Sequence, residues 1–227
     1  MNRESNGYTF LFAIIMVVVV ASALAFASSA LKPNQEANVK KEKMQYILKS
    51  FGVAVERNDS EEAYKKHITS ELVFDKEGNE IGKDAFTLDI AKEKGKFPIF
   101  NAEKDGKKFY VIPVRGMGLW DAIWAYVSVD ENLKVDGIVF DHKSETPGLG
   151  GEITQDYFQN SFIGESIFDA NGNLQGLKVV KGYAGGKEKA DGEVDAISGA
   201  TLTGDGVSEM LVRGLKPYEK YLKSNKK

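Results

Sequence analysis

The sequence lacks the residues on which several kinds of site depend. It has no cysteine and only two histidines in 227 residues. Without cysteine the chain forms no disulfide, ligates no iron–sulfur cluster and has no thiol nucleophile. His67 and His142 are too far apart for a two-histidine zinc motif, so no metal site is predicted. No serine stands in a Gly-x-Ser-x-Gly turn, which disfavours a hydrolase of that type.

Two further absences limit the choice of ligand. The net charge is −3, so there is no basic excess that would indicate a nucleic-acid partner. Neither a Walker A loop nor a Gly-x-Gly-x-x-Gly turn between a strand and a helix is present. Nucleotide binding of these two kinds is therefore not predicted.

The amino-terminal part contains a long stretch without charge. From Tyr8 to Leu31 there is no charged residue, and these 24 residues exceed the roughly 20 that a helix needs to cross a bilayer core. We predict a transmembrane helix at 8–31 after a cytoplasmic segment at 1–7. A cleaved signal peptide is the alternative, because Ala23-Leu24-Ala25 fits a cleavage pattern, but the run is longer than a usual signal.

A helical stalk is predicted next, at 32–56. Met44, Ile47, Leu48 and Phe51 recur at the spacing of one helix face, within a helix expected from Glu36 to Val55. The remaining residues, 57–227, are expected to form one domain. No internal repeat or low-complexity linker divides them.

The middle of this domain is rich in strand signals. Segments 97–102 and 108–114 flank Lys104-Asp105-Gly106, an Asp-Gly hairpin signal. Segments 122–129 and 135–140 flank a second turn, at Asp130-Glu131-Asn132. Alternating turns and β-branched or aromatic residues predict a mainly antiparallel sheet.

Helical spacing returns beyond Gly151. Apolar residues from Ile153 to Phe162 predict a helix, and Leu177 to Val180 predicts a strand. A last helix is expected to end before Pro217. Together with the sheet, these helices predict an α+β fold. The apolar face of the last helix is formed by Val207, Met210, Leu211 and Leu215.

Three glycine-rich segments are candidates for ligand binding: Gly116–Trp120, Glu145–Gly151 and Ser198–Thr201. Glycine lets a backbone approach a planar ligand closely, and clustered N–H groups suit a phosphate. Each segment taken alone is typical of an ordinary turn.

Thr201 ends the third segment, in the pattern Asp195-x-x-Ser198-Gly199-Ala200-Thr201. The Gly-Ala pair is too small to cover the threonine hydroxyl, and an amphipathic helix follows. On spacing alone, Thr201 could simply adjoin a helix N-cap, since Thr203 and Asp205 are both good capping residues.

This heptad resembles the flavinylation signature of the FMN-binding domain family, which is shared by the C subunit of the Na+-translocating NADH:quinone reductase (NqrC) and the G subunit of the Rnf complex. The segment from His142 to Glu152 and the Gly118-Leu119-Trp120 turn are similar to the quinone reductase member in particular. The resemblance covers essentially the whole chain.

The resemblance implies FMN joined covalently to Thr201 by a phosphoester, with the phosphate near the start of a helix at 203–216. It also implies that a separate flavin transferase installs the group and reads part of the heptad. Leu119-Trp120 and Pro147-Gly148-Leu149 are the expected walls of the flavin ring. The implied cofactor-binding residues are Thr201, Asp195, Ser198, Gly199, Ala200, Glu145, Thr146, Pro147, Gly148, Leu149, Gly150, Leu119 and Trp120.

The function implied by the resemblance is that of a one-electron carrier subunit in the bacterial inner membrane. The FMN domain is expected on the periplasmic side, with other subunits of the membrane redox complex as partners. The chain alone is expected neither to oxidise NADH nor to conduct sodium. The alternatives are the G subunit of an Rnf-type complex and an anchored binding domain without redox function.

Overall fold

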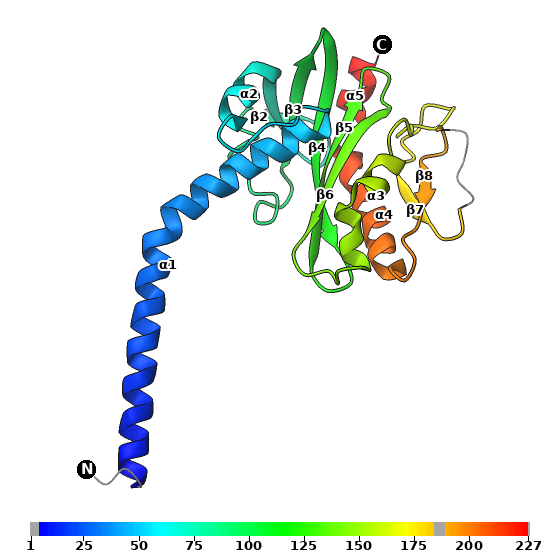
Figure 1. Ribbon diagram of the computed structural model, residues 1–227. Helices are drawn as coiled ribbons and strands as arrows, with labels where there is room; N and C mark the ends of the chain where they lie inside the picture. Colours follow the sequence, from blue (N-terminus) through cyan, green and yellow to red (C-terminus); the bar gives the residue numbers. More distant parts are fainter. Residues whose placement is uncertain (1–4, 184–188, 227) are drawn as a thin grey trace. The chain divides into compact units, whose positions relative to one another are not determined.

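The computed structural model describes residues 5–183 and 189–226. The chain divides into two compact units, Met1–Lys43 and Met44–Lys227. Figure 1 shows a long amino-terminal helix and a domain of sheet and helices.

The first unit consists mainly of helix α1, which runs from Asn6 to Ser50 and continues into the second unit. Within the described residues, α1 is long and apolar enough to cross a membrane, and the side chains of its most apolar stretch are exposed. The helix ends five residues before the predicted Val55. Gly52 adopts a φ of +74°, and Val53 N–H donates to Leu48 O at 3.0 Å, which closes the helix.

The second unit is built on a six-stranded sheet in which every neighbouring pair is antiparallel. The α+β fold predicted from the sequence is confirmed. The strand order is β2-β1-β3-β4-β5-β6, with β1 at Ile68–Phe74, β2 at Glu80–Gly82, β3 at Phe97–Lys104, β4 at Lys107–Met117, β5 at Ala122–Asp130 and β6 at Val135–His142.

Both predicted hairpins form. The β3–β4 turn consists of Asp105 and Gly106, which have φ values of +52° and +74°. Positive φ at both central residues gives the turn that matches the strand twist. In the β5–β6 turn, the Asp130 carboxylate accepts hydrogen bonds from the backbone N–H groups of Asn132 and Lys134, both at 2.9 Å.

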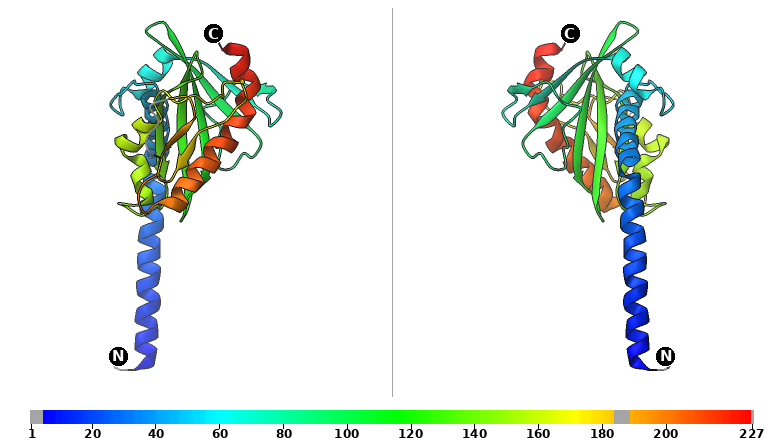
Figure 2. Two further views of the ribbon diagram at one scale, coloured as in Figure 1. Left: turned by 90° about the vertical axis from the view of Figure 1, so that its right-hand side faces the viewer. Right: turned by 90° about the vertical axis from the view of Figure 1, so that its left-hand side faces the viewer.

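Strands β4 and β5 are buried on both faces, because alternate side chains enter two separate cores. Ile112 and Val114 point toward the core under the carboxyl-terminal helices, whereas Val111 points to the core under α2 (Ser60–His67) and the last turns of α1. Figure 2 shows α4 and α5 lying across one face of the sheet.

The segment after β6 contains two short helices where the sequence predicted one. The 3-10 helix η1 covers Gly150–Thr154 and α3 covers Asp156–Ser161. Gln155 between them is extended, with a ψ of 144°, and this interrupts the helix. The predicted strand at 177–180 is present as β7 (Lys178–Val180), which pairs in parallel with β8 (Glu193–Asp195) in a separate two-stranded sheet.

The predicted amphipathic helix is α4, Thr201–Leu215, and its four expected apolar residues are fully buried. A 3-10 turn, η2 (Lys216–Tyr218), and α5 (Glu219–Asn225) follow. The helix therefore begins two residues before the predicted Thr203, which places Thr201 in its first turn.

Candidate functional site

The first two glycine-rich segments and the start of α4 meet around the side chain of Glu145. This residue is 4% exposed. Its Oε1 accepts the backbone N–H of Trp120 at 2.9 Å, and its Oε2 accepts the hydroxyl of Thr203 at 2.7 Å. One acidic side chain thus joins the β4–β5 turn to the first turn of α4.

Gly118, Gly150 and Gly206 make this convergence possible, because a side chain at any of these three positions would collide with a neighbouring atom. A Cβ at Gly118 would lie 2.5 Å from Glu145 Oε1, and one at Gly150 would clash with Glu145 Oε2 and Thr203 Oγ1. A Cβ at Gly206 would clash with the carbonyl oxygen of Met117. The first two turns of α4 therefore pack directly on the backbone of the β4–β5 turn.

The charge of Glu145 is compatible with its burial. Burial alone raises the pKa of this carboxyl group, but hydrogen bonds from Thr203 and from the Trp120 backbone outweigh it, and the pKa is lowered from its ordinary value. The ionised form is therefore favoured in the folded chain.

Thr201 is exposed at the first position of α4, and its hydroxyl makes no hydrogen bond within the described part of the chain. Ala200 is the N-cap, without a side-chain cap. The alternative that Thr203 or Asp205 caps this helix is wrong, because both lie inside it and Thr203 bonds to Glu145. The free N–H groups of a helix start favour a phosphate.

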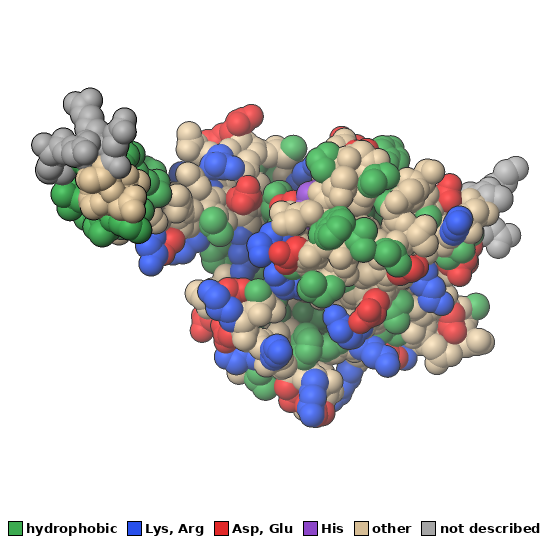
Figure 3. Space-filling view, turned by 90° about the horizontal axis from the view of Figure 1, so that it is seen from below, with side chains coloured by type: hydrophobic (Ala, Val, Ile, Leu, Met, Phe, Trp, Pro, Cys, Tyr) green, Lys and Arg blue, Asp and Glu red, His purple; other side chains and the backbone are tan. Residues whose placement is uncertain are grey.

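Five large apolar side chains are exposed close to these segments, and we call them the apolar rim. Trp120 is 66% exposed, and its indole N–H donates to Thr146 Oγ1 at 3.1 Å. Figure 3 shows hydrophobic side chains gathered on this end of the domain. The apolar rim consists of Met117, Leu119, Trp120, Leu149 and Leu202.

The rim is linked to the heptad through Gly199. A Cβ at Gly199 would lie 2.9 Å from Leu149 Cδ2, so the loop before Thr201 packs against the second glycine-rich segment. The structure thus brings Leu119, Trp120 and Leu149 onto the same part of the surface as Thr201. Met117 was predicted only as a member of the Gly116–Trp120 segment, and Leu202 was not predicted at all.

The remaining predicted residues have different surroundings. Gly150 and Ala200 are buried, whereas Pro147, Gly148 and Ser198 are not. Asp195 is exposed at the end of β8, and its Oδ1 accepts the N–H of Ala196 at 2.9 Å. Nothing in these contacts directs Asp195 toward a ligand.

Both histidines hydrogen-bond to backbone groups through Nδ1, and neither is bonded to Thr201 within the described part of the chain. His142 Nδ1 accepts the backbone N–H of Glu145 at 3.1 Å, and His67 Nδ1 lies 2.9 Å from the carbonyl oxygen of Glu103. Among the described residues, no three His, Asp or Glu side chains are grouped so that they could hold a metal ion. The site therefore consists of a hydroxyl, a helix start and an apolar surface.

The chain is similar to known proteins over most of its length. The model of the FMN-binding domain matches residues 118–216, which include all three glycine-rich segments apart from Gly116 and Met117. The C subunit of the Na(+)-translocating NADH-quinone reductase of Vibrio anguillarum is 30% identical over 91% of this chain and 89% of its own. The corresponding subunit of Neisseria meningitidis is 31% identical over 98% and 96%.

Two solved structures are similar to this one. The C subunit of the reductase from Parabacteroides distasonis superposes with a TM-score of 0.77 at 37% identity and covers 85% of this chain and 96% of its own. NqrC of Shewanella oneidensis gives a TM-score of 0.67 at 28% identity, covering 82% and 98%. Sequence and fold agree over most of the length, and the chain belongs to the NqrC family, the C subunits of Na(+)-translocating NADH-quinone reductases.

Proposed function

We propose that FMN is joined to Thr201 Oγ1 by a phosphoester bond and that the chain is a one-electron carrier in an NADH-quinone reductase. The observation that carries the proposal is the position of Thr201: an exposed hydroxyl at the start of α4, beside an apolar rim. Membership of a family of reductase subunits supports the redox role.

The described residues fit such a cofactor. The N–H groups of the first turn of α4 suit the phosphate, and Leu119, Trp120 and Leu149 offer exposed apolar surface for a flavin ring. The sequence has no lysine or arginine between Lys189 and Arg213, and the helix start itself supplies positive potential beside Thr201. When bound, FMN supplies the capacity to accept and release electrons one at a time.

Attachment is a transfer of the FMN half of FAD to the threonine. Thr201 Oγ1 bonds to the FMN-side phosphorus, the bridging P–O bond of the pyrophosphate breaks, AMP leaves, and the hydroxyl loses its proton. No side chain among the described residues is hydrogen-bonded to Thr201 as a base. A separate flavin transferase therefore performs the activation, and exposed Asp195 and Gly199 are accessible to it.

The tethered cofactor places the electron carrier at the surface. The apolar rim is exposed, so a ring resting on it stays within reach of a neighbouring subunit. Oxidation of NADH and translocation of Na+ belong to partner subunits in this proposal. The relatives are named as subunits of the quinone reductase, which favours that complex over an Rnf-type complex.

The test is the mass of the intact protein after co-expression with a flavin transferase. We expect wild type to be heavier than its amino acids by one FMN less one water, and to fluoresce in a denaturing gel. Thr201→Ala should lack both signals. Thr69→Ala, which removes another exposed threonine hydroxyl, should keep both.

A wild-type chain that never gains this mass would support the anchored binding domain without a flavin. Equal labelling of Thr201→Ala would move the attachment to another residue. Either result contradicts the proposal at a defined step.

A further inference from the structure

A cavity of about 480 Å³ lies on the opposite side of β4 from its pairing with β5, away from the three glycine-rich segments. It is lined by loop residues 90–96, by the first residues of β3 and by the end of α4 with η2. None of the apolar rim residues lines it. Its volume falls in the range of sites for small organic ligands.

Two prolines account for the opening. The registered pairs of β3 and β4 end at Phe100 and Val111. Pro98 lies two residues before Phe100, and Pro113 lies two residues after Val111, so both prolines stand just beyond the last pair. Proline has no N–H to continue a ladder. The carbonyl oxygen of Pro98 accepts a hydrogen bond from the hydroxyl of buried Tyr218 at 2.8 Å. The strands therefore separate here, and the gap has an apolar wall.

The wall and the mouth of the cavity differ in character. Phe97, Pro98, Val114, Pro217 and Tyr218 supply apolar surface. The charged lining residues comprise five cations and a single carboxylate, Glu93. A cleft lined mainly by one sign of charge raises the local concentration of ligands of the opposite sign.

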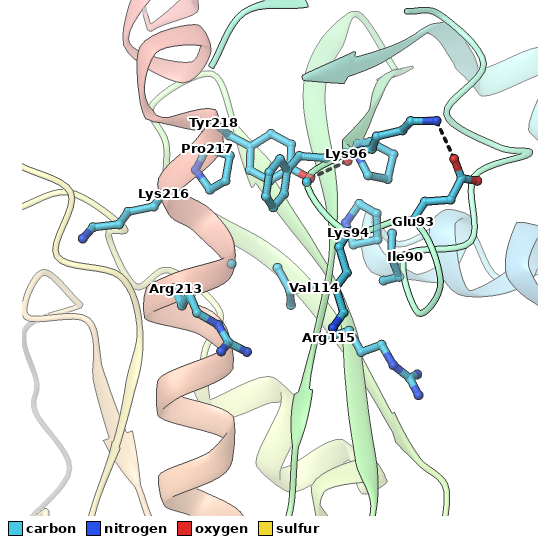
Figure 4. Close-up of a pocket in the computed structure, with 15 residues that line it drawn as sticks. Ile90, Glu93, Lys94, Lys96, Val114, Arg115, Arg213, Lys216, Pro217 and Tyr218 are labelled. Carbon is cyan, nitrogen blue, oxygen red and sulfur yellow. Dashed lines mark hydrogen bonds and ion pairs between the residues drawn. The ribbon is translucent and has the colours of Figure 1, made fainter. Parts of the chain in front are cut away.

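Three of the cations lie near the mouth. In Figure 4, Lys94 and Arg213 extend on either side of Val114, and Arg115 lies beyond Lys94. The Arg115 guanidinium is held 5.5 Å from the centre of the Trp124 ring. Arg115 therefore lies on the face of β4 opposite to Val114, with its cross-strand neighbour Trp124. Lys94 has no ion pair within the described part of the chain, and the partner of Arg213 is exposed Glu209 at 3.2 Å. Lys94 and Arg213 are the two side chains with charge available for a ligand at the mouth.

The other two cations are differently placed. Lys96 is directed to Glu93, with Nζ 2.6 Å from Oε2, and Lys216 extends away from the cavity. Lys216 therefore serves as a control for Lys94 in a binding experiment. Lys94 and Lys216 carry the same charge and line the same opening, but only Lys94 points across it.

We propose that this cavity binds a small amphiphilic anion. Its carboxylate or phosphate contacts Lys94 and Arg213, and its hydrocarbon part lies against Val114, Pro217 and Tyr218. Charge-assisted hydrogen bonds and apolar burial act on opposite ends of one ligand. Both a soluble organic acid and an acidic lipid have this chemistry.

The experiment uses the full chain in nanodiscs of zwitterionic phosphatidylcholine, with empty discs as blank. Titration calorimetry compares octanoate, neutral octanol and inorganic phosphate. We expect octanoate to bind and the other two to bind at least about tenfold more weakly. The double variant Lys94→Gln/Arg213→Gln should weaken octanoate at least about tenfold, and Lys216→Gln should leave it unchanged. Circular dichroism checks that both variants are folded.

Each outcome bears on the proposal. Equal binding of octanol would remove the role of the cations, and equal binding of phosphate would remove the role of the apolar wall. The proposal would be overturned if octanoate did not bind. It would also be overturned if Lys216→Gln lost as much octanoate affinity as the double variant. Discs containing phosphatidylglycerol distinguish the source: loss of the octanoate signal identifies the lipid as occupant, and an unchanged signal identifies a soluble acid.

Discussion

At the scale of the residue, Glu145 connects segments that are far apart in the sequence. Its two oxygens accept from Trp120 and Thr203, 25 and 58 residues away. Gly118 and Gly150 have no side chains that would push the carboxylate away. The buried bond to Thr203 therefore lies two residues after the exposed Thr201 in the same turn of α4.

Replacing Glu145 by glutamine should make the stability of the domain less dependent on pH. The side-chain oxygen of glutamine can accept the Trp120 N–H, but its NH2 can only donate to Thr203 Oγ1. The hydroxyl must then give up its own donation, and charge-assisted bonds become neutral ones. We expect Glu145→Gln to lower the free energy of unfolding by about 1–3 kcal/mol at pH 7. The measurement is urea unfolding of the wild type and the variant from pH 7 to pH 3.

The direction of this pH dependence follows from the lowered pKa of Glu145. The carboxylate contributes its stabilisation above the unfolded-state pKa of about 4.3 and loses it as pH falls through the lower folded-state value. The gap between wild type and Glu145→Gln should therefore narrow below about pH 4.3. A difference in the free energy of unfolding that stays constant with pH would contradict this. The control is Glu77→Gln, at an exposed position, which should differ from wild type by no more than about 0.5 kcal/mol.

The sequence predicted some properties of these residues and not others. The small residues before Thr201 correctly indicated an exposed hydroxyl. The sequence could not separate Thr203 from an ordinary helix cap, because its partner Glu145 is distant in the chain. Local spacing reports exposure well, but it carries no information on which buried polar groups pair.

At the scale of the element, α4 connects the core to the candidate site. Its apolar face is buried against the sheet, while Leu202 in the first turn is 60% exposed in the apolar rim. Packing along one face thus fixes the helix, and the fixed helix presents Thr201.

Two leucines of α4 provide a matched comparison. Leu211 is fully buried, and Leu211→Ala should cost about 2–5 kcal/mol because it leaves a cavity. Leu202→Ala should change the free energy of unfolding by about 0.5 kcal/mol or less. Denaturant titration of both variants checks this. Similar losses in the two would show that α4 is not held by its inner face.

Periodicity explains which elements could be predicted. The face of α4 has four apolar residues at helical spacing, and the hairpins have Asp-Gly or Asp-Glu-Asn turns, so both were recognised. Strand β8 has only three residues, too few for a periodic pattern to identify it before its pairing with β7 is seen. The break at Gln155 was missed because apolar spacing continues across it.

At the scale of the whole molecule, one apolar helix precedes a domain that carries the candidate site. The order of the sheet is set by contacts between distant segments, such as β1 with β3, and no turn signal predicts that pairing. The side of the membrane is a further property that the charges leave open, since Lys32, Lys40, Lys41 and Lys43 all follow the apolar stretch.

The absence of cysteine makes the expected periplasmic position of the domain directly measurable. Lys76→Cys introduces one thiol at a side chain that is 78% exposed in the second unit, and Ser5→Cys introduces one before the apolar stretch. A membrane-impermeant maleimide added to cells with a permeable outer membrane should label Lys76→Cys. Ser5→Cys should react only after the inner membrane is opened. The reverse pattern would place the domain in the cytoplasm, and labelling of both in intact cells would indicate a leaking membrane that must be resealed before repetition. The maleimide reports only on which side of the inner membrane the introduced sulfur lies. This result therefore does not depend on the flavin or on the partner subunits.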